Sequence, residues 1–138
     1  MLVESDSKWL EVVNNAKLTN LMIYLKEEKI EYINSIQDAN KLYDIIIIDG
    51  NYRDECIKVS PEYLSADGLI ILYDSERYPE LCSILRDHDL IQVDFFGLAP
   101  IVYYTKTTSI FFSTTCKLKP LDKLPVFGIG SLCREFDE

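Results

Sequence analysis

Metal-binding and secretion signals are scarce in this sequence. Its one histidine is His88, and no C-x-x-C pair occurs among the four cysteines, Cys56, Cys82, Cys116 and Cys133. This spacing predicts no metal site, and in a reducing compartment we expect free thiols rather than disulfides. The opening residues, MLVESDSKW, carry acids where a signal peptide carries bases. We therefore expect a cytoplasmic protein.

Long apolar runs and clustered basic residues are missing as well. No apolar stretch approaches the roughly 18 residues of a membrane span, so we expect no membrane partner. Lys and Arg number 14 against 23 Asp and Glu, which gives a net charge of -9, and the basic residues form no stripe. Such a chain repels phosphate backbones, so we expect no nucleic acid partner. With 138 residues, 48% of them apolar, the chain suffices for one domain with a core.

Short apolar runs alternate with amphipathic segments along most of the chain. The runs at 2–3, 21–25, 45–48, 69–72, 90–96 and 109–113 predict strands, and the segments at 9–13, 27–41, 54–64 and 79–87 predict helices. The four consecutive isoleucines at 45–48 favour a strand buried on both faces of a parallel sheet. Residues 66–68 predict a turn, and residues 114–138 an irregular tail. The alternation predicts an α/β domain with a mostly parallel sheet flanked by helices.

Acidic residues stand where three of the apolar runs end. Glu4 follows the first run, Asp49 follows the isoleucines, and Asp74 follows the run at 69–72 after one tyrosine. In open α/β sheets, ligands bind outside the carboxyl ends of the strands. The three acids therefore predict a binding site along one edge of the sheet. Each acid has an alternative interpretation as an N-cap or turn former for the helix that follows it.

Several segments, taken in order, resemble one enzyme family. VESDSKW, YDIIIIDGNYRDEC, ADGLIILYDSER, and DFFGLAP followed by TTSIFFS are similar to class I S-adenosylmethionine-dependent methyltransferases with a Rossmann-like fold. The likeness is greatest to the subgroup that methylates small molecules or glycans. It covers residues 1–113 and implies a sheet whose last strand is antiparallel. Residues 114–138 are then a tail that packs on this domain.

The resemblance also implies roles for individual residues. Glu4 matches the acid that binds the ribose hydroxyls of S-adenosylmethionine, with Asp6 and Trp9 just behind it. Asp49, followed by Gly50, matches the acid near the methyl group and the acceptor. The implied cofactor-binding residues are thus Glu4, Asp6, Trp9, Asp49 and Gly50, and the implied catalytic residues are Asp49 and Asp74. Arg53 and Arg77 match loop arginines that either face an anionic acceptor or are solvated.

One family element has no counterpart in the sequence. Members begin with a strand and a glycine-rich turn against which the methionine part of the cofactor packs, whereas the first glycine here is Gly50. In the family's sheet order, 3-2-1-4-5-7-6, this missing strand is the central one. Three resolutions stay open: the strand at 2–3 pairs directly with that at 45–48, another chain (a further copy in a homo-oligomer, or a different one) supplies a strand, or the chain is a piece of a longer protein.

Two classes of function follow from this interpretation. The first is methyl transfer from S-adenosylmethionine to an oxygen or nitrogen of a small-molecule or glycan acceptor, impaired if the truncation removes part of the donor site. The second is a non-catalytic methyltransferase-like module for binding or oligomerisation, in which Val126, Phe127 and Ile129 of the tail form an interaction segment or pack over the sheet. A flavodoxin-like or receiver-like domain is a third interpretation, which Glu4 and Asp6 match only loosely.

Overall fold

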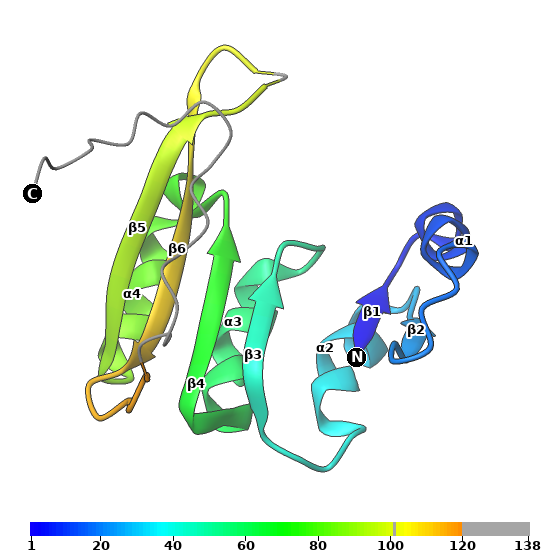
Figure 1. The fold of residues 1–138 in the computed structure, drawn as a ribbon, viewed down its shortest axis with the longest axis horizontal. Coiled ribbons are helices and arrows are strands. Elements are labelled where there is room, and N and C mark those ends of the chain that lie inside the picture. The colour runs from blue at the N-terminus through cyan, green and yellow to red at the C-terminus, as the bar shows by residue number, and fades with distance from the viewer. Residues whose placement is uncertain (101, 120–138) are drawn as a thin grey trace, which may run out of the picture.

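Two sheets of strands organise the chain. The computed structural model describes residues 1–100 and 102–119 (Figure 1). Its N-terminal part contains β1 (Leu2–Glu4), α1 (Ser7–Asn15), β2 (Ile23–Leu25), α2 (Lys29–Asn34) and the 3-10 helix η1 (Ser35–Gln37). Its larger part contains β3 (Tyr43–Ile48), α3 (Arg53–Val59), η2 (Ser60–Tyr63), β4 (Leu64–Tyr73), η3 (Ser75–Arg77), α4 (Pro79–Asp87), β5 (Leu90–Leu98) and β6 (Thr105–Ser113).

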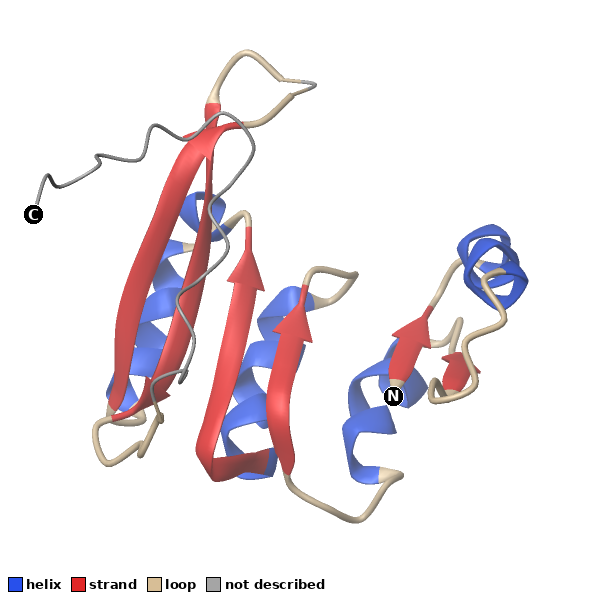
Figure 2. Cartoon of the chain, in the orientation of Figure 1, coloured by secondary structure: helices blue, strands red, loops and turns tan. Residues whose placement is uncertain are grey.

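The larger sheet has the strand order β3-β4-β6-β5, and β1 and β2 form a separate parallel pair. β3 and β4 are parallel, and β6 is antiparallel to both β4 and β5. β3, β4 and β5 therefore run in one direction and the last strand runs against them, as Figure 2 shows. The predicted α/β class, with its antiparallel last strand, is confirmed.

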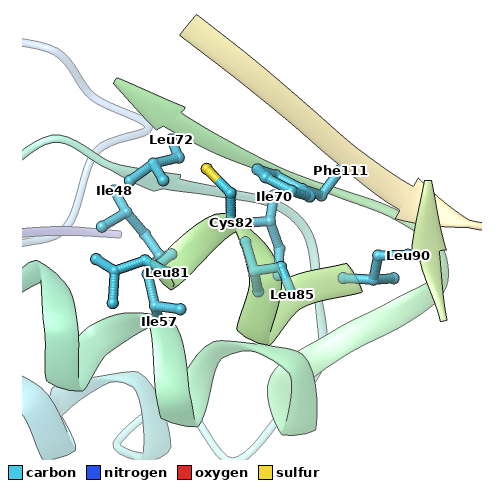
Figure 3. Close-up of a cluster of buried hydrophobic side chains, with 9 residues drawn as sticks. All are labelled: Ile48, Ile57, Ile70, Leu72, Leu81, Cys82, Leu85, Leu90 and Phe111. Atoms are coloured by element: carbon cyan, nitrogen blue, oxygen red, sulfur yellow. The ribbon is translucent and has the colours of Figure 1, made fainter. Parts of the chain in front are cut away.

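The core lies on one face of the larger sheet, between the strands and helices α3 and α4 (Figure 3). Ile57 of α3 and Leu85 of α4 are fully buried there against Ile70 and Leu72 of β4 and Phe111 of β6. Both connections, β3-α3-β4 and β4-α4-β5, join strands of one direction. Such crossovers are right-handed and here move the same way along the sheet, so both helices cover the same face.

The opposite face of this sheet is apolar but open among the described residues. Ile45 and Ile47 are 56% and 66% exposed. The cross-strand register places these two side chains in apolar rows over all four strands, Ile45-Leu69-Phe112-Ile91 and Ile47-Ile71-Ile110-Val93. The prediction that β3 is buried on both faces is therefore wrong. Four consecutive isoleucines are typical of a strand that is buried on both faces, but α3 and α4, the described helices that pack on this sheet, cover only the side of Ile46 and Ile48.

Two local predictions also differ from the structure. Residues 66–68 lie within β4 instead of forming a separate turn, because Tyr43 pairs with Leu64 while Ile45 pairs with Leu69, and this irregular register leaves the intervening residues of β4 as a bulge. The helix predicted at 27–41 ends earlier, at Asn34, and continues only as η1. There the Ser35 hydroxyl donates to the Tyr32 carbonyl at 2.6 Å, which competes with the helical hydrogen bonds.

The two sheets do not join. Within residues 1–100 and 102–119, β1 pairs only with β2, and β3 pairs only with β4 on its one bonded edge. Figure 1 shows β1 and β3 apart, with no strand drawn between them. Direct pairing of these strands, the first of the three resolutions, is therefore wrong.

Two further expectations concern membranes and the tail. In the part of the chain that the structure describes, no helix has the length and apolarity needed to cross a bilayer. The interaction segment predicted at Val126, Phe127 and Ile129 lies outside the described residues, as does most of the predicted tail.

Candidate functional site

β1 and β3 point the same way in Figure 1, and their carboxyl ends meet at one rim of a cavity. At their carboxyl ends, the Asn51 side chain donates to the Ser5 hydroxyl at 2.8 Å. At their amino ends, the Tyr43 hydroxyl lies 3.7 Å from the Met1 sulfur and 3.1 Å from the Ile36 carbonyl. Side chains alone thus bridge the interval at both ends.

The interval between these strands is a cavity of about 530 Å³. Its walls are the lengths of β1 and β3, with Ile33 and Ile36 from the segment between the sheets. At the rim, Glu4, Asp49 and Gly50 line it together. The volume falls in the range of small-molecule sites, and the polar groups gather at one end of it. Three of the five residues expected at a cofactor therefore share this cavity.

Arg53, the first residue of α3, ties the rim together. Its guanidinium donates to the carbonyls of Asp49 (2.6 Å), Gly50 (3.1 Å) and Tyr73 (3.0 Å), and to the Asp49 carboxylate at 3.0 Å. The side chain is only 13% exposed and stacks over the Tyr78 ring, with 5.3 Å from Cζ to the ring centroid. Arg53 therefore locks the end of β3 to the end of β4.

Asp74 lies on the far side of this arginine. Its side chain is buried, and its backbone adopts the left-handed conformation with φ of 56°. Oδ2 lies 3.8 Å from Arg53 Nη1, and Lys106 Nζ lies 2.8 Å from Oδ1 in an ion pair whose alignment falls short of a hydrogen bond. The carboxylate in turn raises the pKa of Lys106. Asp74 thus neutralises two cations behind the rim and does not line the cavity.

Glu4 and Asp6 have local roles as well. Glu4 Oε1 accepts from the backbone N–H groups of Ser5 and Asp6 at 2.7 and 3.0 Å. Asp6 caps α1 by accepting from the backbone N–H of Lys8 at 2.8 Å. Trp9 on α1 is 61% exposed, and neither it nor Asp6 lines the cavity. The turn-forming alternative offered for the strand-end acids describes Glu4, whose carboxylate accepts from the next two backbone N–H groups. The cofactor roles of Glu4, Asp6 and Trp9 stay predictions.

Gly50 permits a close contact that the sequence does not reveal. A Cβ at this position would lie 2.3 Å from the hydroxyl oxygen of Tyr32, so only glycine lets the tyrosine of α2 reach the turn after β3. The Tyr32 ring packs edge-on against Tyr52, with 5.6 Å between the ring centroids. Burial raises the pKa of Tyr32 to about 12 and that of the neighbouring Cys56 thiol to about 11.

Sequence reasoning missed Tyr32 and Cys56 as parts of this site. Tyr32 lies among isoleucines in the segment at 27–41, where it contributes only to the prediction of a helix. The only available signal was the glycine directly after Asp49, because a glycine at the end of a buried strand often marks a close approach.

Comparisons with known proteins identify the fold. No protein-family model matches the sequence, and no curated protein matches it. Three similar solved structures are a precorrin-6y C5,15-methyltransferase from Geobacter metallireducens (TM-score 0.58, 17% identity), a ribosomal protein L11 methylase from Lactobacillus delbrueckii (0.52, 18%) and an rRNA methylase from Streptococcus thermophilus (0.51, 13%). The matches cover 81%, 81% and 80% of this chain but only 65%, 57% and 70% of those chains. The chain thus has the Rossmann-like fold of class I methyltransferases and spans less than two thirds of the first two.

These neighbours correct our expectation about partners. We expected a small-molecule acceptor and no nucleic acid, but proteins of this fold include a ribosomal protein methylase and an rRNA methylase. The physical reason is that net charge sums over the whole surface, whereas binding depends on the local field at the site. The overall charge of -9 therefore does not exclude a macromolecular acceptor.

Proposed function

We propose that this domain binds S-adenosylmethionine at the rim of β1 and β3 and transfers its methyl group to an oxygen or nitrogen of an acceptor. The observation that carries the proposal is that two strand-end acids, Glu4 and Asp49, line one end of the cavity, with Asp74 buried behind them at the end of β4. The Asn51–Ser5 hydrogen bond joins the ends of β1 and β3, and Arg53 joins those of β3 and β4. The shared methyltransferase fold supports the same assignment.

The carboxylate of Glu4 suits the ribose of this cofactor. Backbone N–H groups occupy Oε1 and fix the orientation of the side chain. An ionised carboxylate has about four acceptor positions, so Oε2 can receive both ribose hydroxyls. The described residues thus fit the nucleoside end of the cofactor, and the methionine end would lie beyond the carboxyl ends of β1 and β3, beside Asp49 and Gly50.

Asp49 is positioned to serve the acceptor. When bound, S-adenosylmethionine supplies a methyl group activated by its sulfonium. The Asp49 side chain is 58% exposed at the cavity, and Arg53 holds one of its oxygens at 3.0 Å. The other oxygen can orient an acceptor O–H or N–H and take its proton. Asp74 is the second candidate, acting through Arg53 as a positioning residue. The acceptor itself is best sought by assay, since proteins of this fold carry names as different as precorrin, L11 and rRNA methylases.

Titration calorimetry with S-adenosylhomocysteine tests the donor site. We expect binding in the micromolar range, weakened about tenfold or more (about 1.4 kcal/mol) in Glu4→Gln. Glu62→Gln is the matched control, because Glu62 is an exposed acid that precedes β4, at the opposite end of the strands. Equal affinity in both variants would contradict the role of Glu4.

A second function is favoured by one specific observation. The cavity has no central strand among the described residues, so half the wall expected around a methyl donor is open. A non-catalytic methyltransferase-like module is consistent with this geometry. The same calorimetry separates the two proposals: a folded protein that gives no heat at millimolar S-adenosylhomocysteine supports the module and opposes the enzyme.

A further inference from the structure

Within residues 1–100 and 102–119, the two strands that border the cavity present backbone groups without strand partners to each other. In a parallel ladder, both backbone groups of one residue point to the same neighbour, and alternate residues point to opposite sides. The Leu2 N–H bonds to the Met22 carbonyl and the Glu4 carbonyl accepts from Lys26, each at 2.8 Å, so both residues face β2. The N–H and carbonyl of Val3 therefore face the cavity.

β3 contributes the second edge. Its other side is hydrogen-bonded to β4 from Ile45 to Ile48. Within the described residues no strand pairs with the edge that faces the cavity. The free edges of β1 and β3, two strands that run in the same direction, thus face each other across the cavity, which forms a groove between them. Unpaired strand edges are templates for another strand, and buried backbone groups without partners are costly.

The side chains along the groove are suited to a peptide strand. The lining is apolar along its length, with Val3, Ile33, Ile45 and Ile47 among its residues. The acids Glu4 and Asp49 stand at its carboxyl end. A small molecule could fill the volume but could not supply alternating donors and acceptors to both walls. The described strands each belong to a sheet already, so a described strand of a second copy could add only at one edge.

We propose that this groove receives a single extended segment of a partner protein, which runs parallel to β1 and β3 and pairs with both. The segment spans three to six residues, the lengths of β1 and β3. It carries apolar side chains along the groove and a basic residue near Glu4 and Asp49. It joins the two sheets of this domain into one, in the manner of strand addition but with both edges used. The proposal stands whether or not the rim binds a methyl donor.

A peptide titration tests this insertion. The probe is a fluorescent peptide with the sequence Lys-Val-Ile-Val-Ile-Lys, titrated up to millimolar concentration against the whole 138-residue chain and followed by anisotropy. Two control peptides carry N-methyl groups on alternate residues: one on the odd-numbered residues of the peptide, the other on the even-numbered ones. In an inserted strand, the N–H groups of odd-numbered residues bond to one edge and those of even-numbered residues to the other. Each control loses one of these two sets, so each should bind at least tenfold more weakly. Hydrogen exchange at Val3 and at the isoleucines of β3 should slow with the unmethylated peptide.

Several outcomes would overturn the proposal. If one of the two methylated peptides still binds as well as the unmethylated one, the peptide adds to a single edge. If all three peptides bind equally, the contact is apolar and involves no strand pairing. Absence of both binding and exchange protection also rejects it. The variant Val3→Pro removes the N–H that faces the groove while Leu2 and Glu4 keep their bonds to β2, so it should weaken the unmethylated peptide at least tenfold. If this variant fails to fold, the peptide series still decides.

Discussion

At the scale of single residues, Arg53 does most to form the site. Its hydrogen bonds reach three backbone carbonyls and one carboxylate on two successive strand ends. The sequence marked this arginine only as a loop residue that could face an anion. Backbone carbonyls have no sequence signature, so this role could not be predicted. Asp49 and Glu4, in contrast, could be placed from the sequence because strand ends share one edge in this fold class.

Loss of the Arg53 side chain should destabilise the fold. We expect Arg53→Met to lower the free energy of unfolding by about 3 kcal/mol, because hydrogen bonds from a charged group are lost and the buried Asp74 loses one of its cations. Urea denaturation measures the change. Lys58→Met, on the exposed side of the same helix, is the control and should change it by less than about 0.5 kcal/mol. Equal losses of unfolding free energy in the two variants would show that the hydrogen bonds of Arg53 contribute nothing to stability.

Gly50 and Tyr32 should behave as a coupled pair. Gly50→Ala puts a Cβ 2.3 Å from the tyrosine hydroxyl, so we expect a loss of about 1–2 kcal/mol as the ring moves. In a Tyr32→Phe background the nearest remaining ring atom is Cζ at 3.5 Å, an ordinary contact, so the alanine should cost less than about 0.5 kcal/mol. A double-mutant cycle in urea measures this coupling. Additive effects would contradict the predicted contact.

Stability should fall at alkaline pH because of Cys56 and Tyr32. Burial raises the pKa of Cys56 from 9.0 to about 11 and that of Tyr32 from 10.0 to about 12. In these ranges the unfolded chain loses its protons first, so unfolding becomes easier as pH rises from 9 towards 12. We expect the double variant Cys56→Ala/Tyr32→Phe to lose at least about 1 kcal/mol less than the parent between pH 8.5 and 11. Parallel urea curves for both proteins across this range would rule out the effect.

At the scale of elements, β3 shows how far periodicity can be trusted. The sequence predicted this strand and gave α4 its observed bounds, since Pro79 begins the helix. It did not predict that only one face of the strand is covered. A strand made of consecutive apolar residues can be buried on both faces. Whether both faces are in fact buried depends on which helices pack against the sheet. Here α3 and α4 both lie on one side.

Neighbouring isoleucines of β3 should therefore differ in their effect on stability. Ile48 is 6% exposed in the core, and Ile48→Ala should cost about 2–4 kcal/mol of unfolding free energy. Ile47 is 66% exposed on the open face, and Ile47→Ala should cost less than about 1 kcal/mol. The two variants remove the same atoms and are each other's control. Urea midpoints with similar shifts would mean that the open face is covered in solution.

At the scale of the whole molecule, the chain has a methyltransferase fold in which no described strand lies between β1 and β3. The strand order implied by the resemblance is present on both sides of this interval, as β2-β1 and β3-β4-β6-β5. The sequence indicated the missing strand through the absence of an early glycine-rich turn. It could not show whether the neighbouring strands close up, because that depends on contacts between distant side chains, such as the hydrogen bonds of Tyr43 to Ile36 and of Asn51 to Ser5.

The central claim is that Glu4 and Asp49, with Asp74 behind them, mark one rim where a methyl donor binds. Nuclear magnetic resonance tests it most directly. The ¹⁵N-labelled chain is titrated with S-adenosylhomocysteine, and amide shifts are mapped on the structure. The account predicts the largest shifts at residues 4–6 and 49–53, with smaller shifts near Asp74 and none along the body of α4. Shifts elsewhere that spare both strand ends, or no shifts at millimolar ligand, would contradict it.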